Sequence, residues 1–409
     1  MSQNPKEFDP DVIQASSAPE QQMYRAERAS REPMHSILEN NPEIYVVPPQ
    51  RSSNWGNWEF KKGSYYDTTT GSKHPHWAGV DLPRPTKDIE RLRADLLQWG
   101  YGLVEDALSP EQVSAAQTRV LEQAEGERLA GIAQKTPSGQ NINCCVNKGR
   151  CFELLIEQHP SAMQGGPLVE QLLDECLGKG WISTSMIASI ALEGGVPQAL
   201  HPDQGMGLEA RNPMLVNAVT AVTDIDETNG GTLIIPGSHR ALHEAARSGN
   251  PVGKLPPAIN VEARAGTVIL YDGRTLHGTG VNHTQEPRIV LLNGMQKPWL
   301  KQQENWILSV RPEVLRRASP KLLHRMGYQA WTAAQTNEGH GFGARGLPGE
   351  AGGALVAFRL AADEGRYLRV GELGPGSSPE DLKAQYTLRN VVQAARAVRP
   401  SKPKQAFDR

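Results

Sequence analysis

The chain has 409 residues, with 43 lysines and arginines against 45 aspartates and glutamates, so its formal charge is −2. This length allows one large domain with additions or two ordinary domains. Because the charge is balanced and no segment is dominated by basic residues, we expect no nucleic-acid partner. The chain shows no apolar leader and no apolar run of about 18 residues, so we expect a cytoplasmic protein with no membrane partner.

Glycine, proline and cysteine narrow the class of fold. The 40 glycines and 30 prolines are typical of a chain with many turns, as in β-rich proteins. The four cysteines lie in one region without CxxC spacing: Cys144, Cys145, Cys151 and Cys176. The sequence therefore predicts reduced thiols, and neither a zinc ribbon nor a disulfide framework.

Residues 1–86 are predicted to form an N-terminal arm that is partly irregular and rich in aromatic residues. Residues 21–32 are a candidate helix within a polar stretch. From residue 51 the aromatic side chains are too dense to stay in solvent, so we expect this part to lie across the main domain. A contribution to a substrate entrance or a subunit contact is the alternative. The aromatic residues are Trp55, Trp58, Phe60, Tyr65, Tyr66 and Trp77.

The next part of the chain is predicted to be mainly helical. Apolar residues at helical spacing predict a helix at 88–98, and Ser109 followed by Pro110 is a strong start for another that runs to about 128. A stretch rich in Gly, Asn and Gln predicts a loop at 130–150. The other elements expected here are a strand at 101–105 and helices at 152–156 and 168–177.

From Trp181 onward short apolar runs alternate with turn signals. The expected strands are 182–192, 197–203, 214–223, 232–235, 267–276 and 289–296, with a helical excursion at 241–248. Strands spaced in this way predict a mainly β fold with flanking helices, of the double-sheet jelly-roll type, within a domain at 87–300. Residues 301–409 are expected to be a helical and irregular extension packed on that core, with a helix near 379–398.

One tripeptide carries a pattern suited to metal binding. His201 and Asp203 flank a proline, and in an extended segment side chains two apart point to the same face. An imidazole and a carboxylate placed so are two of the three ligands in a 2-His-1-carboxylate triad for non-haem Fe(II). His277 is the best third candidate, because it stands where an apolar strand meets a Gly-rich turn. The rival pair, His239 and His243, lies in a segment with the signals of a surface turn.

Several motifs occur together in a fixed order. They are Gly100 to Val104 before the Ser109 helix start, Gln198 to Asp203, Asp226 to Arg240, Ala265 to Leu270, His277 to Asn282, and Pro287-Arg288. In this order and spacing, residues from about 97 to 297 resemble the phytanoyl-CoA dioxygenase family of Fe(II)/2-oxoglutarate oxygenases. The resemblance covers about half of the chain.

The resemblance implies a double-stranded β-helix, cupin-like, in which His201, Asp203 and His277 hold Fe(II) and form the catalytic centre. It implies that Arg288 holds the far carboxylate of 2-oxoglutarate. The chemistry agrees, because three protein ligands leave positions for the 2-oxo acid and O2, and a buried carboxylate is best held by the fork of an arginine. Halogenase relatives lack the carboxylate ligand, so Asp203 also argues against chlorination.

Three further residues are expected at the 2-oxoglutarate site. Thr279 shares a face with His277 and is expected to donate a hydrogen bond to the same far carboxylate. Gln198 and Thr232 match positions that contact the co-substrate in relatives. In the same family the segment at His239 is a turn after a core strand, so His239 is not assigned to the metal.

The sequence therefore predicts an Fe(II)- and 2-oxoglutarate-dependent dioxygenase that oxidises a small, largely apolar molecule in specialised metabolism. Hydroxylation, desaturation and rearrangement all remain open as outcomes. A metal-dependent hydrolase on the same fold is one alternative, although it gives Arg288 no role; a non-catalytic binding protein is another. A homo-oligomer is compatible with the sequence. Candidate pocket walls are Trp181, Met186, Met206, Met295 and Trp299.

Overall fold

A computed structural model describes residues 75–328 except 196 and 199, residues 371–378, and the short segments 40–41, 50–51, 58–59, 336–337 and 340–341. The helices predicted at 21–32 and near 379–398 lie outside these residues. So do four of the aromatic residues of the N-terminal arm and the side chain of a fifth, Trp58.

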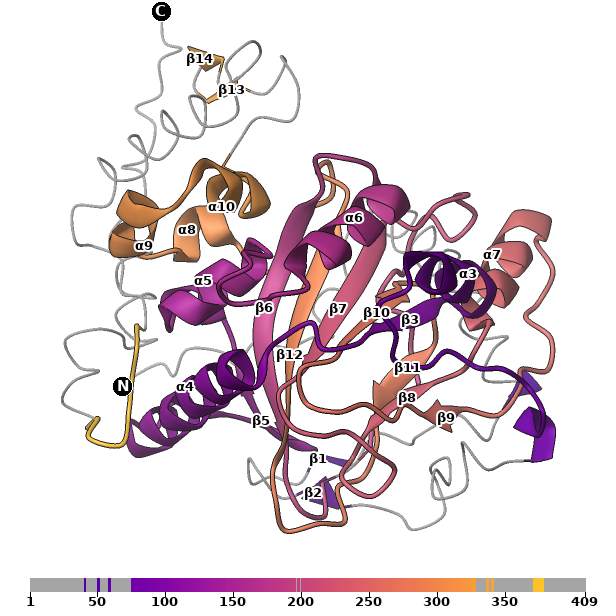
Figure 1. The fold of residues 1–409 in the computed structure, drawn as a ribbon, viewed down its shortest axis with the longest axis horizontal. Helices are drawn as coiled ribbons and strands as arrows, with labels where there is room; N and C mark the ends of the chain where they lie inside the picture. Colours follow the sequence, from indigo (N-terminus) through magenta and orange to yellow (C-terminus); the bar gives the residue numbers. More distant parts are fainter. Residues whose placement is uncertain are drawn as a thin grey trace, which may run out of the picture.

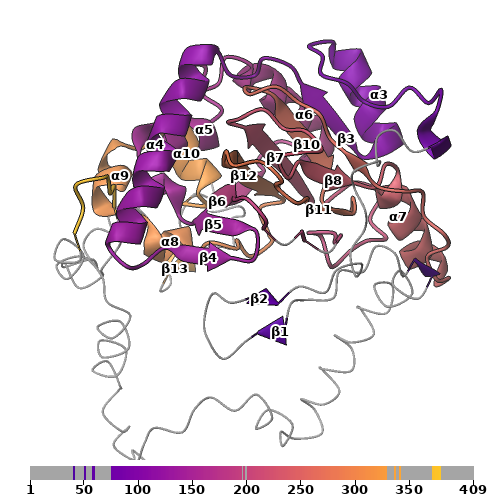
Figure 2. The same cartoon turned by 90° about the horizontal axis from the view of Figure 1, so that it is seen from below.

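Ten strands form the centre of the described part of the chain. They are β3 (Tyr101–Val104), β4 (Gln134–Thr136), β5 (Gly139–Ile142), β6 (Ile182–Ala191), β7 (Leu215–Ala221), β8 (Thr232–Ile234), β9 (Ile259–Asn260), β10 (Val268–Asp272), β11 (His277–Thr279) and β12 (Arg288–Gln296). Seven make a sheet in the order β3-β10-β7-β12-β6-β5-β4, and three make a second sheet in the order β11-β8-β9. All neighbours within the two sheets are antiparallel. This arrangement is the predicted jelly roll, a double-stranded β-helix (Figures 1 and 2).

Most of the helices lie on the outside of the larger sheet, whereas α7 packs beside the smaller one (Figure 1). The helices are α3 (Ile89–Trp99), α4 (Pro110–Leu129), α5 (Arg150–Ile156), α6 (Gly166–Leu177), α7 (Ser238–Ser248), α8 (Trp306–Ser309), α9 (Pro312–Arg317) and α10 (Pro320–Arg325), with single 3-10 turns at Pro75–Trp77 and Cys145–Asn147. Helix α4 starts at the predicted place, where Ser109 and Gln112 form a reciprocal capping box. Two-residue strands pair apart from the main sheets, β1 (Gln50–Arg51) with β2 (Trp58–Glu59) and β13 (Thr336–Asn337) with β14 (His340–Gly341).

Alternation along the strands of the larger sheet separates an outer from an inner cluster. Successive residues of a strand point to opposite faces, and β3, β7, β10 and β12 supply both clusters. On β6, Met186, Ala188 and Ile190 pack in the outer cluster, which also holds apolar residues of α4, α5 and α6. Between the sheets, Val219 and Tyr271 of the larger sheet pack with Ile234 and Ile259 of the smaller one. The inner space between the sheets is where ligands can be held.

Three of the expectations for local structure are wrong. Residues 130–150 are not all loop, because β4 and β5 form a hairpin that extends the larger sheet beyond β6. The residues of this edge hairpin are mostly polar, so the hydrophobic pattern of the sequence does not indicate strands there. The described residues of 197–203 form no strand, and among them His201 alone makes an isolated bridge. His239 is not on a surface turn but buried in the first turn of α7.

Several described residues outside 87–300 contact the central domain. Trp77 is buried, donates through Nε1 to the carbonyl of Pro257 at 3.1 Å, and packs edge-on against Trp99. Apolar residues of α8, α9 and α10 belong to the outer cluster of the larger sheet. Leu373 packs with Ala130 at the end of α4. In the part of the chain that the structure describes, no helix has the length and apolar character needed to cross a bilayer.

Candidate active site

Two histidines separated by 76 positions in the sequence are brought together by backbone hydrogen bonds. The amide of His201 donates to the carbonyl of His277, and the amide of His277 donates to the carbonyl of His201, both at 3.0 Å. This single antiparallel bridge sets the two imidazoles side by side, with ring centroids 4.7 Å apart. Upstream, the amide of Gln198 donates to the carbonyl of Thr279 at 2.8 Å, so the segment before His201 follows β11.

Asp203 completes a triad with these histidines. Its Oδ1 lies 3.6 Å from Nε2 of His201, and its Oδ2 lies 3.4 Å from Nε2 of His277. One ligand atom from each of the three residues lies within 4.8 Å of the others, and this is the one group of that kind among the described residues. Two imidazole nitrogens and one carboxylate oxygen are a donor set that fits Fe(II) with open positions.

The orientation of the His277 ring is fixed by contacts on the side away from Asp203. Its Nδ1 lies 3.0 Å from the carbonyl oxygen of Thr275, a contact in which Nδ1 carries the proton and donates. Nε2 is then the ring nitrogen that faces Asp203. The ring of Tyr271 packs on the same imidazole, with centroids 4.5 Å apart. A metal-binding histidine held in this way has one available nitrogen and a fixed ring plane.

The electrostatics of Asp203 favour its charged form. Burial raises the pKa of this carboxyl, but the hydrogen-bonding contacts with His201 and His277 outweigh burial, so its pKa lies well below its usual range. An ionised carboxylate is the form that binds a metal cation. His201 and Asp203 are partly exposed, whereas His277 is buried, so the triad has one open side.

Arg288, the first residue of β12, is the most unusual charged group of the site. Its side chain is 2% exposed, and its Nε and Nη2 atoms have no hydrogen-bond partner within the described residues. Burial lowers the pKa of this guanidinium to about 10. A buried cation without a counterion is costly, and an anion that enters the site removes that cost. The dicarboxylate 2-oxoglutarate fits this requirement.

The triad and Arg288 line one cavity of about 600 Å³. Thr279, Gln198 and Thr232 line the same cavity, so the structure brings all seven predicted residues together. The side-chain Oε1 of Gln198 accepts from the amide of Thr279 at 3.1 Å. The cavity is therefore a single space lined both by a buried cation and by the candidate metal-binding triad.

Most of the predicted pocket walls lie elsewhere. Trp181, Met186 and Met295 are buried in the outer cluster between the larger sheet and its helices, so they are core residues. Trp299 is largely exposed and lies outside the cavity lining, whereas Met206 lines it. The walls are formed instead by residues that the sequence did not single out: Asn141, Thr184, Ser185, Ile187, Gln204, Met214, Leu215, Asn217, Val219, Tyr271, Val290, Leu292, Gly294, Gln296, Leu300, Lys301 and Gln303.

The rival histidines occupy a different place. His239 and His243 line a separate cavity of about 300 Å³ beside α3 and α6. Nε2 of His239 lies 3.3 Å from the carbonyl oxygen of Leu97, and Nδ1 of His243 lies 3.1 Å from that of Leu208. Each imidazole therefore has a backbone partner and neither belongs to the triad.

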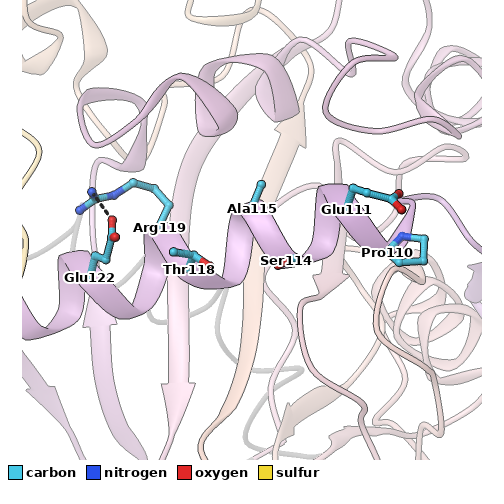
Figure 3. Close-up of a pocket in the computed structure, with 7 residues that line it drawn as sticks. All are labelled: Pro110, Glu111, Ser114, Ala115, Thr118, Arg119 and Glu122. Carbon is cyan, nitrogen blue, oxygen red and sulfur yellow. Dashed lines mark hydrogen bonds and ion pairs between the residues drawn. The ribbon is translucent and has the colours of Figure 1, made fainter.

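A further depression runs along α4 (Figure 3). Within the described residues its lining comes from this helix alone, between Pro110 and Glu122. Its ion pair joins Arg119 and Glu122 at 2.9 Å, one turn apart on the helix surface. Among the described residues no second element faces this helix, so the depression offers a ligand only one wall.

Sequence reasoning missed two residues that contact the triad. Asn217 donates from Nδ2 to Oδ2 of Asp203 at 2.9 Å, and Tyr271 packs on His277. Both lie within apolar strand patterns, at positions that face the space between the sheets. No local motif marks them, because each contact is made across the fold.

Comparison with known proteins agrees with this geometry. A family model described as phytanoyl-CoA dioxygenase matches residues 97–290. The chain is 29% identical to Dioxygenase af480 of Aspergillus fumigatus over 260 residues, which are 61% of this chain and 82% of that protein. It is 29% identical to Dioxygenase aneA of Aspergillus aculeatus over 155 residues, 34% of this chain and 49% of that protein.

Solved structures show a more distant likeness. The non-heme alpha ketoglutarate dependent carbocyclase SnoK from nogalamycin biosynthesis aligns with a TM-score of 0.40 and 17% identity, over 53% of this chain and 87% of that one. HygX from Streptomyces hygroscopicus, with nickel and 2-oxoglutarate bound, aligns with a TM-score of 0.41 and 16% identity, over 52% of this chain and 89% of that one. These similarities are too distant to transfer an activity.

Proposed function

The chain belongs to the phytanoyl-CoA dioxygenase family of Fe(II)- and 2-oxoglutarate-dependent oxygenases, and we propose that it oxidises a small molecule at the cavity between its two sheets. The observation that carries the proposal is the pairing of two features in one cavity. The triad of His201, Asp203 and His277 offers a donor set for Fe(II), and Arg288 offers a buried guanidinium that has no counterion among the described residues. A metal site alone does not need such a cation, but a metal site that takes a dicarboxylate does.

In this proposal each residue has a defined task. His201, Asp203 and His277 hold the iron, which supplies the oxidising power when 2-oxoglutarate and O2 are present. Arg288 binds the far carboxylate of 2-oxoglutarate through its fork of N–H donors. Thr279 lines the same cavity and donates its hydroxyl to that carboxylate.

The remaining polar residues support the co-substrate less directly. Thr232, on β8, pairs in register with Thr279 on β11, so the two hydroxyl residues stand on neighbouring strands. Gln198 fixes the segment before His201 against the Thr279 amide. We assign both to the 2-oxoglutarate side of the cavity.

The apolar and polar residues of the cavity suggest how it is divided. Val290 and Leu292 lie on the same face of β12 as Arg288, at every second position. An apolar surface suited to the methylene groups of 2-oxoglutarate therefore adjoins the cation. Further along the same strand, Gly294 and Gln296 also line the cavity. Met206, Met214, Leu215 and Leu300 line it too, and we assign their apolar surface to a largely apolar substrate.

We place the catalytic domain at 87–300, with an N-terminal arm before it and an extension at 301–409 after it. We further propose a cytoplasmic enzyme of specialised metabolism that acts on neither nucleic acid nor membranes. A metal-dependent hydrolase on this fold is disfavoured, because it leaves the guanidinium of Arg288 buried without a function.

The proposal is tested by measuring succinate formed from 2-oxoglutarate under air, with purified protein and added Fe(II). Even without a substrate, an enzyme of this class is expected to convert 2-oxoglutarate slowly, and a substrate screen is then scored by the acceleration of that rate. A protein that binds Fe(II) yet forms no succinate with any tested small molecule would contradict the proposal.

A further inference from the structure

Two of the three proposed iron ligands stand on a connecting segment and not on a strand. His201 and Asp203 lie between β6 and β7, and their side chains are 38% and 35% exposed. His201 is fixed by the backbone bridge to His277, but Asp203 lies two residues beyond it. A carboxylate has two equivalent oxygens and a freely turning end, so a loop position alone does not define how it meets a metal.

The larger sheet supplies the missing constraint. Asn217, on β7, is 9% exposed, and its Nδ2 donates to Oδ2 of Asp203 at 2.9 Å. β7 is held on both sides by hydrogen-bonded strands, β10 and β12, so its backbone is among the most constrained in the domain. The amide therefore ties a carboxylate on a loop to a rigid part of the fold.

The neighbours of Asn217 fit this role. Tyr271 pairs with Asn217 across β10, and its ring packs on the imidazole of His277. Gly294 pairs with Asn217 across β12. A Cβ at Gly294 would clash with Cγ2 of Thr184 at 2.4 Å and would lie in ordinary contact with Oδ1 of Asn217 at 3.4 Å. Two paired strands, β7 and β10, thus contact two of the three proposed ligands.

We propose that Asn217 is a positioning residue that occupies one oxygen of Asp203 and directs the other to the metal. A neutral donor is suited to this task, because it fixes the carboxylate without adding a charge that would compete with the cation. With Asp203 held to one metal contact, the positions needed for 2-oxoglutarate and O2 stay open. This inference rests on the proposed function and extends it to a residue outside the ligand set.

The test compares Asn217→Leu with Asn293→Leu. Asn293 is a similarly buried amide on β12 whose side chain is hydrogen-bonded to Ser183 and does not line the cavity. Its replacement therefore also removes one buried, hydrogen-bonded amide from the larger sheet. The first readout is Mn(II) affinity without oxygen chemistry, from the electron paramagnetic resonance signal of free Mn(II). The second is the visible band formed anaerobically with Fe(II) and 2-oxoglutarate.

We expect Asn217→Leu to weaken Mn(II) binding by about 10- to 100-fold, as loss of a partner to a metal ligand commonly does, and to shift or weaken the visible band. Asn293→Leu is expected to leave both readouts as in the wild type. Asn217→Gln keeps the amide donor and is expected to recover most of the lost affinity. If Asn217→Leu does not fold, Asn217→Ala makes the same test without added apolar bulk.

Wild-type affinity and an unchanged band in Asn217→Leu or Asn217→Ala would overturn the inference, and so would equal losses in Asn293→Leu. These outcomes differ from failure of the proposed function. If the wild-type protein itself forms no band with Fe(II) and 2-oxoglutarate, the proposed function fails. If the wild type forms the band and the Asn217 variants match it, only the positioning role fails.

Discussion

Replacing Arg288 by methionine is expected to have opposite effects on the ligand-free protein and on 2-oxoglutarate binding. Without a ligand, the guanidinium is buried and its Nε and Nη2 have no partner in the described residues. Removing it relieves a desolvation cost. With 2-oxoglutarate, the same group supplies the paired hydrogen bonds that hold the far carboxylate, so its loss weakens binding.

Both magnitudes follow from the surroundings of Arg288. A guanidinium ordinarily has a pKa above 12, and burial lowers that of Arg288 to about 10. That difference corresponds to about 3 kcal/mol of destabilisation of the charged side chain, an upper bound for what Arg288→Met recovers in the ligand-free protein. Each hydrogen bond to a charged group is worth roughly 1.5–3 kcal/mol. Losing two of them raises the 2-oxoglutarate concentration needed by at least about 100-fold.

The first assay is chemical unfolding of the protein in two states, metal-free and with saturating Mn(II) and 2-oxoglutarate. The second is a titration of succinate formation with 2-oxoglutarate. The control is Arg274→Met. Arg274 is also buried, but it is paired with Asp272 through contacts of 2.9 and 2.6 Å. Its loss leaves Asp272 unpaired and is expected to destabilise the ligand-free protein by about 3–5 kcal/mol. A ligand-free Arg288→Met protein destabilised as strongly, with unchanged dependence on 2-oxoglutarate, would refute the reasoning.

Other predictions follow from single sites. Asp203→Ala is expected to abolish succinate formation while the metal-free protein stays folded; wild-type turnover would remove Asp203 from the ligand set. Burial lowers the pKa of His239 to about 4, below its ordinary 6.5, so the unfolded chain takes up the proton first. The stability tied to neutral His239 is present above pH 6.5 and lost as pH falls through 4, by up to about 3 kcal/mol. Unfolding titrations of His239→Gln should therefore fall less steeply with acid than the wild type, and parallel curves would argue against it. Lys148 contacts Glu127 at 2.6 Å with both side chains buried, so Lys148→Met should cost about 3–5 kcal/mol in urea unfolding, with recovery in the double variant with Glu127→Gln. No recovery would mean that the cost is not that of an unpaired carboxylate.

The parts of the site that the sequence predicts are those with local patterns. His201 and Asp203 stand two apart, and Arg288 follows His277 at a fixed spacing across a turn. The jelly roll is also predictable, because the apolar runs that form its longer strands are separated by turn-forming stretches. The structure places His201, Asp203, His277 and Arg288 in one cavity, as the spacing suggests.

The parts that the sequence does not predict depend on tertiary contacts. The 197–203 segment has the composition of a strand, yet it follows β11 through a few isolated hydrogen bonds. In the sequence, Asn217 is a single polar residue within an apolar strand. Its role follows only from the folded structure, in which it donates to Asp203. The β4–β5 hairpin is polar because it forms the exposed end of a sheet, so hydrophobic periodicity carries no signal for it.

The most direct test of the central claim is an anaerobic titration of the purified protein with Fe(II) and 2-oxoglutarate, followed by visible absorbance. The account predicts a weak metal-to-ligand charge-transfer band that appears only when both are present and is lost in Asp203→Ala. Absence of the band in the wild-type protein, with Zn(II) retained at the site in its place, would contradict the account.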